Sequence, residues 1–459
     1  MSFPKYPEYK DSGVQWLGKV PSHWSTRPLW TLFRRIKRSG FMNETLLSVY
    51  RDYGVIPKSS RADNFNKPSE DLAPYQLVEV GDLAINKMKA WQGSVAISNY
   101  RGIVSPAYFV YANENEEDAR YLHYLFRCNE YTHGYLSRSK GIRVNQWDLE
   151  PQEHSRMEVL LPPRAEQVQI ATFLNHETGK IDALIEEQRR LIELLKEKRQ
   201  AVISHAVTKG LDPNVPMKDS GVEWLGEVPA HWDVVPLRRA VEWIQTGGTP
   251  SQDSFEEEPK NGIPWFTPGD FGDDLSLHSA RKSVSHESIV GGESKVFPIL
   301  SVLVVGIGAT LGKVAISEIE FSANQQINVV IPSPHVSGRF LAYSLSVKSE
   351  PMKLLSNAST IGIINQQKTK EIWVCIPPTG EQEEIERDLR RITSQIDALL
   401  SGAYEAIELL EERRSALISA AVTGKIDVRG WSAGAKAEAP GLAMVAEDRA
   451  EYSAQGGGA

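Results

Sequence analysis

Apolar residues recur at alternating intervals of four and three in two long segments, residues 162–209 and 377–428. Nine of the ten positions in this series are apolar in the second segment, and seven of the ten matching positions are apolar in the first. A repeat sustained over more than four heptads predicts a coiled-coil helix that pairs along one seam with another helix. We expect the helix-pairing residues to include Ile181, Leu184, Leu191, Leu195, Ile396, Leu399, Ala403 and Leu410.

Both helical segments have well-marked ends. Each begins at a Pro-Pro pair, at Pro162 and Pro377, because proline cannot be continued backwards as helix. Gly210 and Gly424 follow the last helical positions, where glycine commonly ends a helix. Each helix is then about 60 Å long, and a helix of that length needs a partner along its apolar seam. The simplest partner is the other copy, and the whole domain between the two predicts an antiparallel pair.

The chain repeats its own sequence twice. Residues 10–24 and 218–232 are identical at 12 of 15 positions with an offset of 208, and residues 162–212 and 377–427 at 24 of 51 positions with an offset of 215. Such repeats indicate a duplicated architecture, here with a pseudo-two-fold relation between the halves. The predicted segments are a cap (1–24), a variable domain (25–161), a long helix (162–209), a linker with the repeated cap (210–232), a second variable domain (233–376), a second long helix (377–428) and a disordered Ala- and Gly-rich tail (429–459).

The two variable domains have mixed α and β character. Short strands are predicted in the first domain at residues 78–88, 93–98 and 102–111, and in the second at 301–308, 312–317 and 324–332. A helix follows in each domain, near residues 119–136 and 338–357. The predicted fold class is therefore α/β (α+β), with two such domains separated by two long antiparallel coiled-coil helices.

The composition is ordinary for a soluble globular protein of two to four domains, with 459 residues of which 41% are hydrophobic and 24% charged. No apolar run approaches the roughly 18–20 residues that span a bilayer, and the N-terminus lacks the apolar core of a signal peptide. Cys128 and Cys375 lie in different segments, which favours a reducing compartment over a disulfide framework. We expect a cytoplasmic protein without membrane attachment.

The net charge of −8 excludes a uniformly basic nucleic-acid binder. Basic residues nevertheless cluster at residues 34–38 and 138–143 of the first variable domain, either as solvated faces or as phosphate contacts. The second variable domain is net acidic and contains the run Glu256, Glu257 and Glu258. If it binds DNA, either a small basic patch or a partner subunit must supply the phosphate contacts, and we favour the partner.

The sequence contains no convincing catalytic constellation. Residues 306–314, GIGATLGKV, have the wrong glycine spacing for a phosphate-binding loop, and Val314 replaces the hydroxyl residue, so a strand–turn–strand is predicted. Asp274, Glu293 and Lys295 have the residue types of a metal-dependent nuclease, but an E-x-K triplet is expected by chance in a chain of this length. The histidines show no metal-ligand spacing. The pattern favours a binding protein with no catalytic or metal-ligating residues of its own.

Two motifs carry a resemblance to a known family. The caps contain GVxWLGxVPxHW at residues 13–24 and 221–232, and the helices share EQ…IDAL…IELLxExRxAxIS between residues 166–204 and 381–419. These motifs resemble the specificity (S) subunit of type I restriction–modification systems, over about residues 8–428. MKAWQGSVAIS at residues 88–98 and GATLGKVAIS at 308–317 are similar to two common sorts of target recognition domain.

The resemblance implies a non-catalytic subunit that binds double-stranded DNA. Each target recognition domain would read one half of a bipartite, asymmetric sequence, while the helices set the spacing and dock two methyltransferase (M) subunits. Restriction (R) translocase–nuclease subunits would join to give an adenine-specific DNA methyltransferase and ATP-dependent type I restriction endonuclease. S-adenosylmethionine, ATP and Mg are then expected on the partner subunits, and no cofactor on this chain. A rod of about 60 Å covers at most about 18 base pairs, enough for half-sites one helical turn apart.

Candidate DNA-binding residues lie on loops near the predicted strands. Arginine and lysine suit phosphates or guanine, whereas asparagine and glutamine suit adenine edges. The candidates in the first domain are Lys87, Lys89, Trp91, Gln92, Arg138, Lys140, Arg143, Asn145 and Gln146. Those in the second domain are Thr310, Lys313, Asn324, Gln325, Thr360, Asn365 and Gln366. The two Asn-Gln pairs are equally consistent with capped turns, and the cap tryptophans Trp16, Trp24, Trp224 and Trp232 suit packing on a helix better than base stacking.

Two other functions stay open. One is a two-headed scaffold whose domains bind proteins, which copurification with a methyltransferase would separate from an S subunit. The other is a nuclease that uses Asp274, Glu293 and Lys295, which would require the isolated chain to lose cleavage activity on Glu293→Ala.

Overall fold

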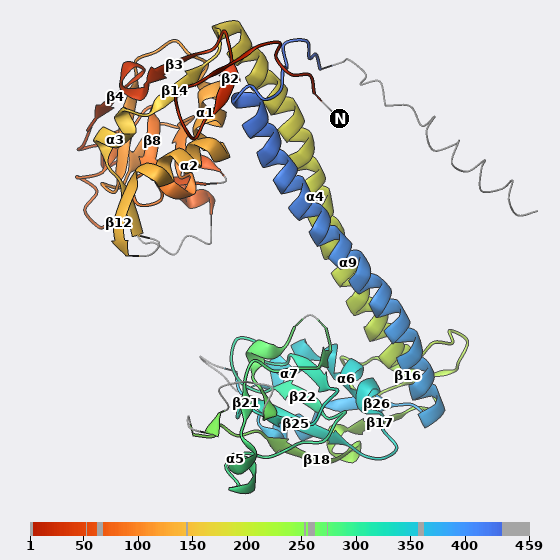
Figure 1. Cartoon of the computed structure of the whole chain (residues 1–459). Helices are drawn as coiled ribbons and strands as arrows, with labels where there is room; N and C mark the ends of the chain where they lie inside the picture. The colour runs from red at the N-terminus through yellow and green to blue at the C-terminus, as the bar shows by residue number, and fades with distance from the viewer. Residues whose placement is uncertain are drawn as a thin grey trace, which may run out of the picture. The chain divides into compact units, whose positions relative to one another are not determined.

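The computed structural model describes residues 3–51, 53–61, 68–143, 146–251, 254–255, 262–272, 274–356 and 362–433. The chain forms two compact units, the first made of Met1–Gln188 with Glu405–Ala459 and the second of Arg189–Tyr404. Each unit contains a cap, one variable domain and a segment of both long helices (Figure 1). The predicted tail lies largely outside the described residues.

The first unit is built around a four-stranded antiparallel sheet. Its strands in spatial order are β4 (Phe33–Ile36), β11 (Tyr108–Asn113), β8 (Leu83–Asn86) and β9 (Val95–Ile97). The apolar residues of β8 and β9 are buried, and α1 (Ala119–Arg127) packs on β9. Asp118 starts α1 as its N-cap, because its carboxylate accepts the free N–H groups of Arg120 and Tyr121.

Two-stranded antiparallel pairs and short helices complete the first unit. The pairs are β1 (Tyr9–Asp11) with β2 (Lys19–Pro21), β3 (Ser25–Pro28) with β14 (Glu158–Leu161), β5 (Leu47–Tyr50) with β6 (Gly54–Pro57), β7 (Gln76–Val78) with β10 (Gly102–Val104), and β12 (Ser139–Arg143) with β13 (Gln146–Leu149). The helices are α2 (Asn129–Arg138) and α3 (Pro151–Ser155).

The second unit contains a five-stranded mixed sheet. Its order is β18 (Val241–Thr246), β25 (Ile327–Pro332), β22 (Val302–Val305), β23 (Val314–Ser317) and β20 (Ser276–Leu277), with only the β20–β23 pair parallel. A three-stranded sheet joins β21 (Ser283–Val284), β19 (Ile263–Phe266) and β24 (Ser322–Ala323), and two further pairs join β15 (Met217–Asp219) with β16 (Glu227–Pro229) and β17 (Asp233–Pro236) with β26 (Trp373–Ile376). The short helices are α5 (His286–Val290), α6 (Gly338–Ser346), α7 (Ser349–Leu355) and α8 (Gln366–Lys370).

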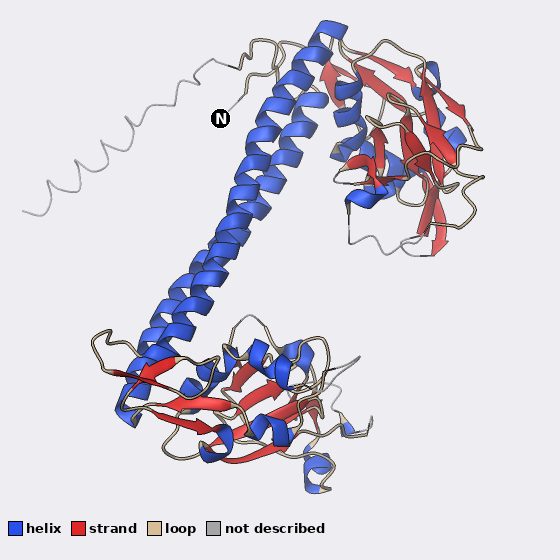
Figure 2. Ribbon diagram, turned by 180° about the vertical axis from the view of Figure 1, so that it is seen from behind, coloured by secondary structure: helices blue, strands red, loops and turns tan. Residues whose placement is uncertain are grey.

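The strands and helices lie close to their predicted positions. Residues 306–313 form the turn between β22 and β23, as the predicted strand–turn–strand requires, with Gly308 and Gly312 at positive φ values of 104° and 82°. Each predicted helix is divided in two, at Cys128 in the first unit and around Val347 in the second. The ribbon in Figure 2 shows helices and strands mixed within each unit.

The two long helices are α4 (Arg164–Lys209) and α9 (Thr379–Val422). Both begin just after their Pro-Pro pair and end one or two residues before the predicted glycines, which take φ values of 77° at Gly210 and 73° at Gly424. In the first unit the start of α4 shares a core with the end of α9. In the second unit the start of α9 shares a core with the end of α4.

The structure corrects the predicted seam at three positions. Leu184, Leu191 and Leu399 are 52%, 42% and 59% exposed, whereas Ile181, Leu195, Ile396 and Ala403 are buried and Leu410 is half-buried. Ile185 and Ile192, each one residue further along α4, are buried instead. Leucine and isoleucine are adjacent at 184–185 and 191–192, so the apolar pattern fits two neighbouring stripes of the helix, and packing selects the second.

No helix in the described part of the chain combines the length and apolar character needed to cross a membrane.

Candidate nucleic-acid interface

In the first unit, four candidates lie on one turn at the end of the sheet. The turn joins β8 to β9 and contains the short 3-10 helix η3 (Ala90–Gln92). Gly93 ends this helix with a φ of 89°, a conformation that favours glycine. Lys89 and Gln92 are exposed, while Lys87 and Trp91 are partly buried.

The β12–β13 hairpin packs against this turn and brings the second group of candidates to it. The Leu149 N–H donates to the Lys87 carbonyl at 3.2 Å, and the Trp91 and Trp147 rings meet edge to face at 4.7 Å. The Lys87 ammonium lies 3.6 Å from the Asp148 carboxylate. Residues about sixty positions apart in sequence therefore form one surface.

The other predicted residues of the first unit lie on or near the hairpin. Arg138 is half-buried at the end of α2, and Lys140 is exposed on β12. The backbones of Arg143 and Gln146 pair with each other across the hairpin. Asn145 lies outside the described residues.

Two of the four basic residues at positions 34–38 form ion pairs. Arg34 pairs with Glu114 at 2.5 Å, and Arg38 pairs with Asp82. The Arg35 guanidinium lies 4.6 Å from the centre of the Phe109 ring. Burial raises the pKa of Asp82 in spite of its arginine partner. This cluster is consistent with a solvated, ion-paired face rather than a free phosphate site.

Sequence reasoning missed a group at the tip of the β5–β6 hairpin. Arg51 reaches the turn, since its Cγ lies 3.8 Å from the position that a Cβ on Gly93 would take. The Arg61 guanidinium lies 5.0 Å and 4.8 Å from the ring centres of Tyr50 and Tyr53, and Tyr53 is exposed. The available signal was the interleaving of arginine and tyrosine between Tyr50 and Tyr53, a combination that suits phosphates and bases.

In the second unit the described candidates also converge at one end of the sheet. The β22–β23 turn at residues 306–313 leaves the same end at which β25 begins and β18 finishes. It carries Thr310, which is exposed, and Lys313, whose ammonium donates to the Phe271 carbonyl at 2.7 Å. Asn324 and the exposed Gln325 precede β25.

The second Asn-Gln pair forms the capped turn that was one of its two alternatives. Asn365 is the N-cap of α8 and accepts the Lys368 N–H at 3.0 Å, as the capped-turn alternative supposed. The Gln366 side-chain amide lies 3.0 Å from the Thr246 hydroxyl at the end of β18. The pair therefore lies at the same end of the sheet as the β22–β23 turn, and Thr360 lies outside the described residues.

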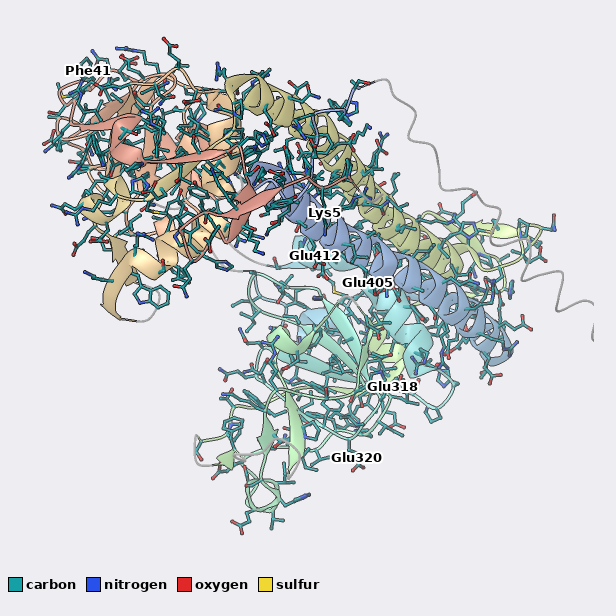
Figure 3. The ribbon with its side chains drawn as sticks, turned by 45° about the horizontal axis from the view of Figure 1, so that its top comes forward. Lys5, Phe41, Glu318, Glu320, Glu405 and Glu412 are labelled. Carbon is teal, nitrogen blue, oxygen red and sulfur yellow. The ribbon has the colours of Figure 1, made fainter. Side chains whose placement is uncertain are left out.

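The acidic residues of the nuclease alternative are engaged in local contacts. Glu293 accepts hydrogen bonds from the Ser251 and Ser254 hydroxyls at 3.1 and 2.5 Å, which lower its pKa. Asp274 accepts the Ser276 N–H at 3.2 Å. Within the described ranges, no three His, Cys, Asp or Glu side chains form a group that could hold a metal ion. Figure 3 labels acidic residues of the second unit, among them Glu318, which pairs with Arg339.

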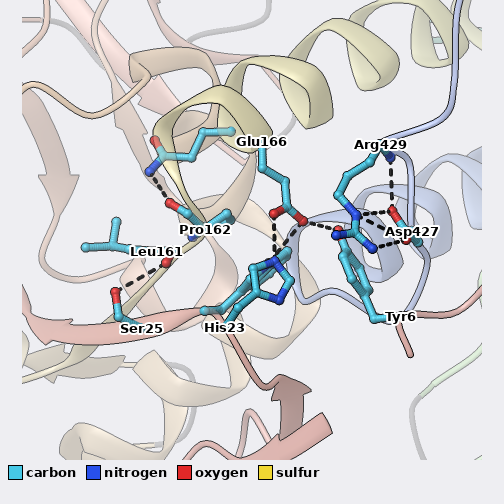
Figure 4. Close-up of polar contacts among 10 residues, drawn as sticks. Tyr6, His23, Ser25, Leu161, Pro162, Glu166, Asp427 and Arg429 are labelled. Atoms are coloured by element: carbon cyan, nitrogen blue, oxygen red, sulfur yellow. Dashed lines mark hydrogen bonds and ion pairs between the residues drawn. The ribbon is translucent and has the colours of Figure 1, made fainter. Parts of the chain in front are cut away.

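The caps fasten each variable domain to the start of a long helix. In the first unit Glu166 of α4 accepts from the Trp24 indole at 3.1 Å and lies 2.9 Å from His23, and the Tyr6 hydroxyl also bonds to it (Figure 4). In the second unit Glu381 of α9 accepts from the Trp232 indole at 3.0 Å and lies 2.8 Å from His231. Trp24 and Trp232 are fully buried, so they pack against the helices and are not available for base stacking.

The comparisons with known proteins agree with this architecture. A family profile described as "Type I restriction modification DNA specificity domain" matches residues 229–409. The chain is 23% identical over 455 residues to the putative type I restriction enzyme MjaX specificity subunit of Methanocaldococcus jannaschii, covering 94% of this chain and 99% of that one. It is 21% identical over 490 residues to the type I restriction enzyme StySPI specificity subunit of Salmonella potsdam, covering 96% and 98%.

A solved structure shares the fold. A chain from "Structural basis underlying complex assembly and conformational transition of the type I R-M system" matches with a TM-score of 0.67 and 18% identity, covering 88% of this chain and 98% of that one. The alignments with the two relatives cover nearly the whole length of both chains, and the family profile matches the second half of this chain. Residues 229–409 therefore match the DNA specificity domain of type I restriction–modification systems, and the chain is similar over nearly its whole length to specificity subunits of type I restriction enzymes.

Proposed function

We propose that each unit reads one half of a bipartite, asymmetric DNA sequence. The observation that carries this proposal is the same construction in both units: a turn between two neighbouring strands of the main sheet contacts the segment that follows two short helices, α1 and α2 in the first unit and α6 and α7 in the second. The turns are residues 87–94 and 306–313, and the segments are the β12–β13 hairpin and residues 362–370. The two surfaces present different side chains, so they suit different half-sites.

The long helices act as a spacer of two antiparallel coiled-coil strands related by a pseudo-two-fold axis. Support comes from an ion pair that occurs once in each unit. Arg414 pairs with Asp182 at 2.8 Å in the first unit, and Arg199 pairs with Asp397 at 3.2 Å in the second. The offset of 215 that relates the repeats converts Asp182 to Asp397 and Arg199 to Arg414. The same offset relates Glu166 of α4 to Glu381 of α9, the two glutamates that the cap tryptophans contact.

Two methyltransferase subunits dock on the exposed leucines of these helices. Leu184 and Leu399 are equivalent in the repeats and both exposed, and so are Leu194 and Leu409. The first unit carries Leu184 and Leu409, and the second carries Leu194 and Leu399. Exposed leucines of this kind are typical of a protein–protein contact, and their repetition suits two copies of one partner.

The chain itself performs no chemistry in this proposal. S-adenosylmethionine, ATP and Mg act on the methyltransferase subunits and on the restriction translocase–nuclease subunits. The methyltransferases also supply most phosphate contacts at the acidic second domain, because release of counterions from DNA need not come from the chain that reads the bases. The assembled complex then methylates adenine and, with its restriction subunits, cleaves DNA.

A domain exchange tests the proposal. Residues 25–161 are replaced by the corresponding domain of another specificity subunit, and the complex with its methyltransferase is assayed by methylation mapping on genomic DNA. We expect one half of the methylated sequence to change and the other to stay. A change in both halves would refute the assignment of one half to each unit, and copurification without DNA methylation would favour a protein scaffold.

A further inference from the structure

Asn328 is a buried polar residue in an otherwise apolar strand. It lies on β25, whose other residues from Ile327 to Ile331 are buried and apolar. Burial of an amide costs free energy unless its donors and acceptors are all satisfied. Both ends of the Asn328 side chain are satisfied, and every partner lies at the end of the sheet where the candidate DNA-binding residues converge.

The Asn328 amide joins the sheet to residues 362–370, which we call the reading loop. Its Nδ2 donates to the Ile364 carbonyl at 2.8 Å and to the Thr369 hydroxyl at 3.0 Å. Its Oδ1 accepts from the Thr246 hydroxyl of β18 at 2.9 Å. Thr369 is fully buried and donates in turn to the Asn365 carbonyl at 2.9 Å. One side chain therefore fixes both ends of the segment Ile364–Thr369.

A close backbone contact reinforces this attachment. The Ile364 N–H donates to the Gly306 carbonyl at 2.8 Å, and a Cβ at Gly306 would lie only 2.6 Å from the Ile364 carbonyl oxygen. Glycine is therefore needed at position 306 for the loop to approach, although its φ is not positive. The loop rests on the first residue of the β22–β23 turn, so the two candidate elements keep a fixed relation to each other.

We propose that Asn328 is a positioning residue for recognition of the second half-site. It does not face DNA, since it is buried. It holds Asn365 and Gln366 against the β22–β23 turn, and loops that contact base edges need such support to keep hydrogen-bonding groups in place. This inference rests on the proposed function of the second unit as a DNA reader.

Three substitutions test the role in the full complex with its methyltransferase subunits. Asn328→Asp keeps the shape but replaces the two donated hydrogen bonds by repulsion from the Ile364 carbonyl. Thr369→Val is isosteric and removes the hydroxyl on the loop side. Gly306→Ala pushes the loop away without changing any polar group. The matched control is Ser317→Ala, which removes a buried hydroxyl that donates to the Ile319 carbonyl at 2.7 Å at the far end of β23.

Methylation mapping supplies the measurement, with the half-site of the second unit assigned by the domain exchange. We expect the preference for the cognate second half over single-base changes to fall about ten-fold in the three variants, as expected for loss of one buried hydrogen bond. The preference for the first half should not change in these variants, and the Ser317→Ala control should keep the wild-type preference for both halves. The role of Asn328 would be overturned if all three folded variants kept the wild-type preference for the cognate second half. It would also be overturned if the preference fell equally in both halves. A wild-type complex with no bipartite sequence would instead overturn the proposed function.

Discussion

Lys348 lies in the core of the second unit and offers a quantitative test of its energetics. Its side chain is 1% exposed. The ammonium donates to the Ser344 carbonyl at 2.7 Å and to the Ser344 hydroxyl at 3.0 Å, and it lies 5.5 Å from the centre of the Trp224 ring. In the part of the chain that the structure describes, these neutral groups and the Cys375 thiol surround it rather than a carboxylate. Burial therefore lowers the pKa of Lys348 to about 8 from 10.5.

The shift converts into a dependence of stability on pH. Because the folded-state pKa is depressed, the unfolded chain binds the proton more readily between about 8 and 10.5, so stability rises with pH across this window. Below pH 8 the buried charge costs about 3 kcal/mol, and between pH 7 and pH 9.5 this cost falls by about 2 kcal/mol. Lys348→Met removes the charge and keeps most of the apolar volume.

We expect Lys348→Met to stabilise the second unit at pH 7 by about 1–2 kcal/mol, after about 1 kcal/mol is subtracted for the lost hydrogen bonds. Its advantage over the wild type should shrink at pH 9.5. The measurement is urea unfolding at both pH values, read as the difference between the two proteins, which cancels the titration of groups that do not interact with Lys348. Ser344→Ala is the control, because it keeps the charge and should keep the wild-type pH dependence. A difference that is constant or grows with pH would refute the argument.

Two further predictions concern the caps and the DNA surface. Glu166→Gln should destabilise the first unit by about 1–3 kcal/mol in urea unfolding. The effect should exceed that of Glu381→Gln on the second unit, because Glu166 is buried and accepts one more hydrogen bond than Glu381. Equal effects of the two substitutions would contradict this prediction. Lys89→Ala and Lys140→Ala should each reduce the slope of log K against log salt by about 1 in DNA binding by the complex, whereas Lys87→Ala should change it less because Asp148 already pairs with Lys87; three equal slopes would contradict the proposed surface.

The repeated frame was predictable from the sequence for a physical reason. Each cap tryptophan must pack on the start of a helix, and each helix start must present a glutamate to it, so Trp24 and Glu166 recur as Trp232 and Glu381. Constraints of this kind leave identical residues at an offset that is constant within each repeated block, 208 for the caps and 215 for the helices. The seam was less certain, because Leu184 and Ile185 are both apolar and lie on neighbouring stripes of the helix. Hydrophobicity alone does not separate two such stripes, while burial in the folded chain does.

The surface of the first unit shows why the candidate residues could be listed but not assembled. The suitability of Lys87 and Trp91 for DNA binding could be predicted from their residue types. Their contact with the β12–β13 hairpin could not, because it depends on Trp147 and Leu149, which were not candidates for DNA binding. Ion pairing likewise depends on the fold. Arg38 has no obvious partner in the sequence, yet it pairs with Asp82, which lies directly before β8. A basic residue near a predicted turn is therefore evidence of a DNA surface only once its possible carboxylate partners have been placed. By that criterion the exposed Lys89 and Lys140 are stronger candidates than Lys87 or the residues at 34–38.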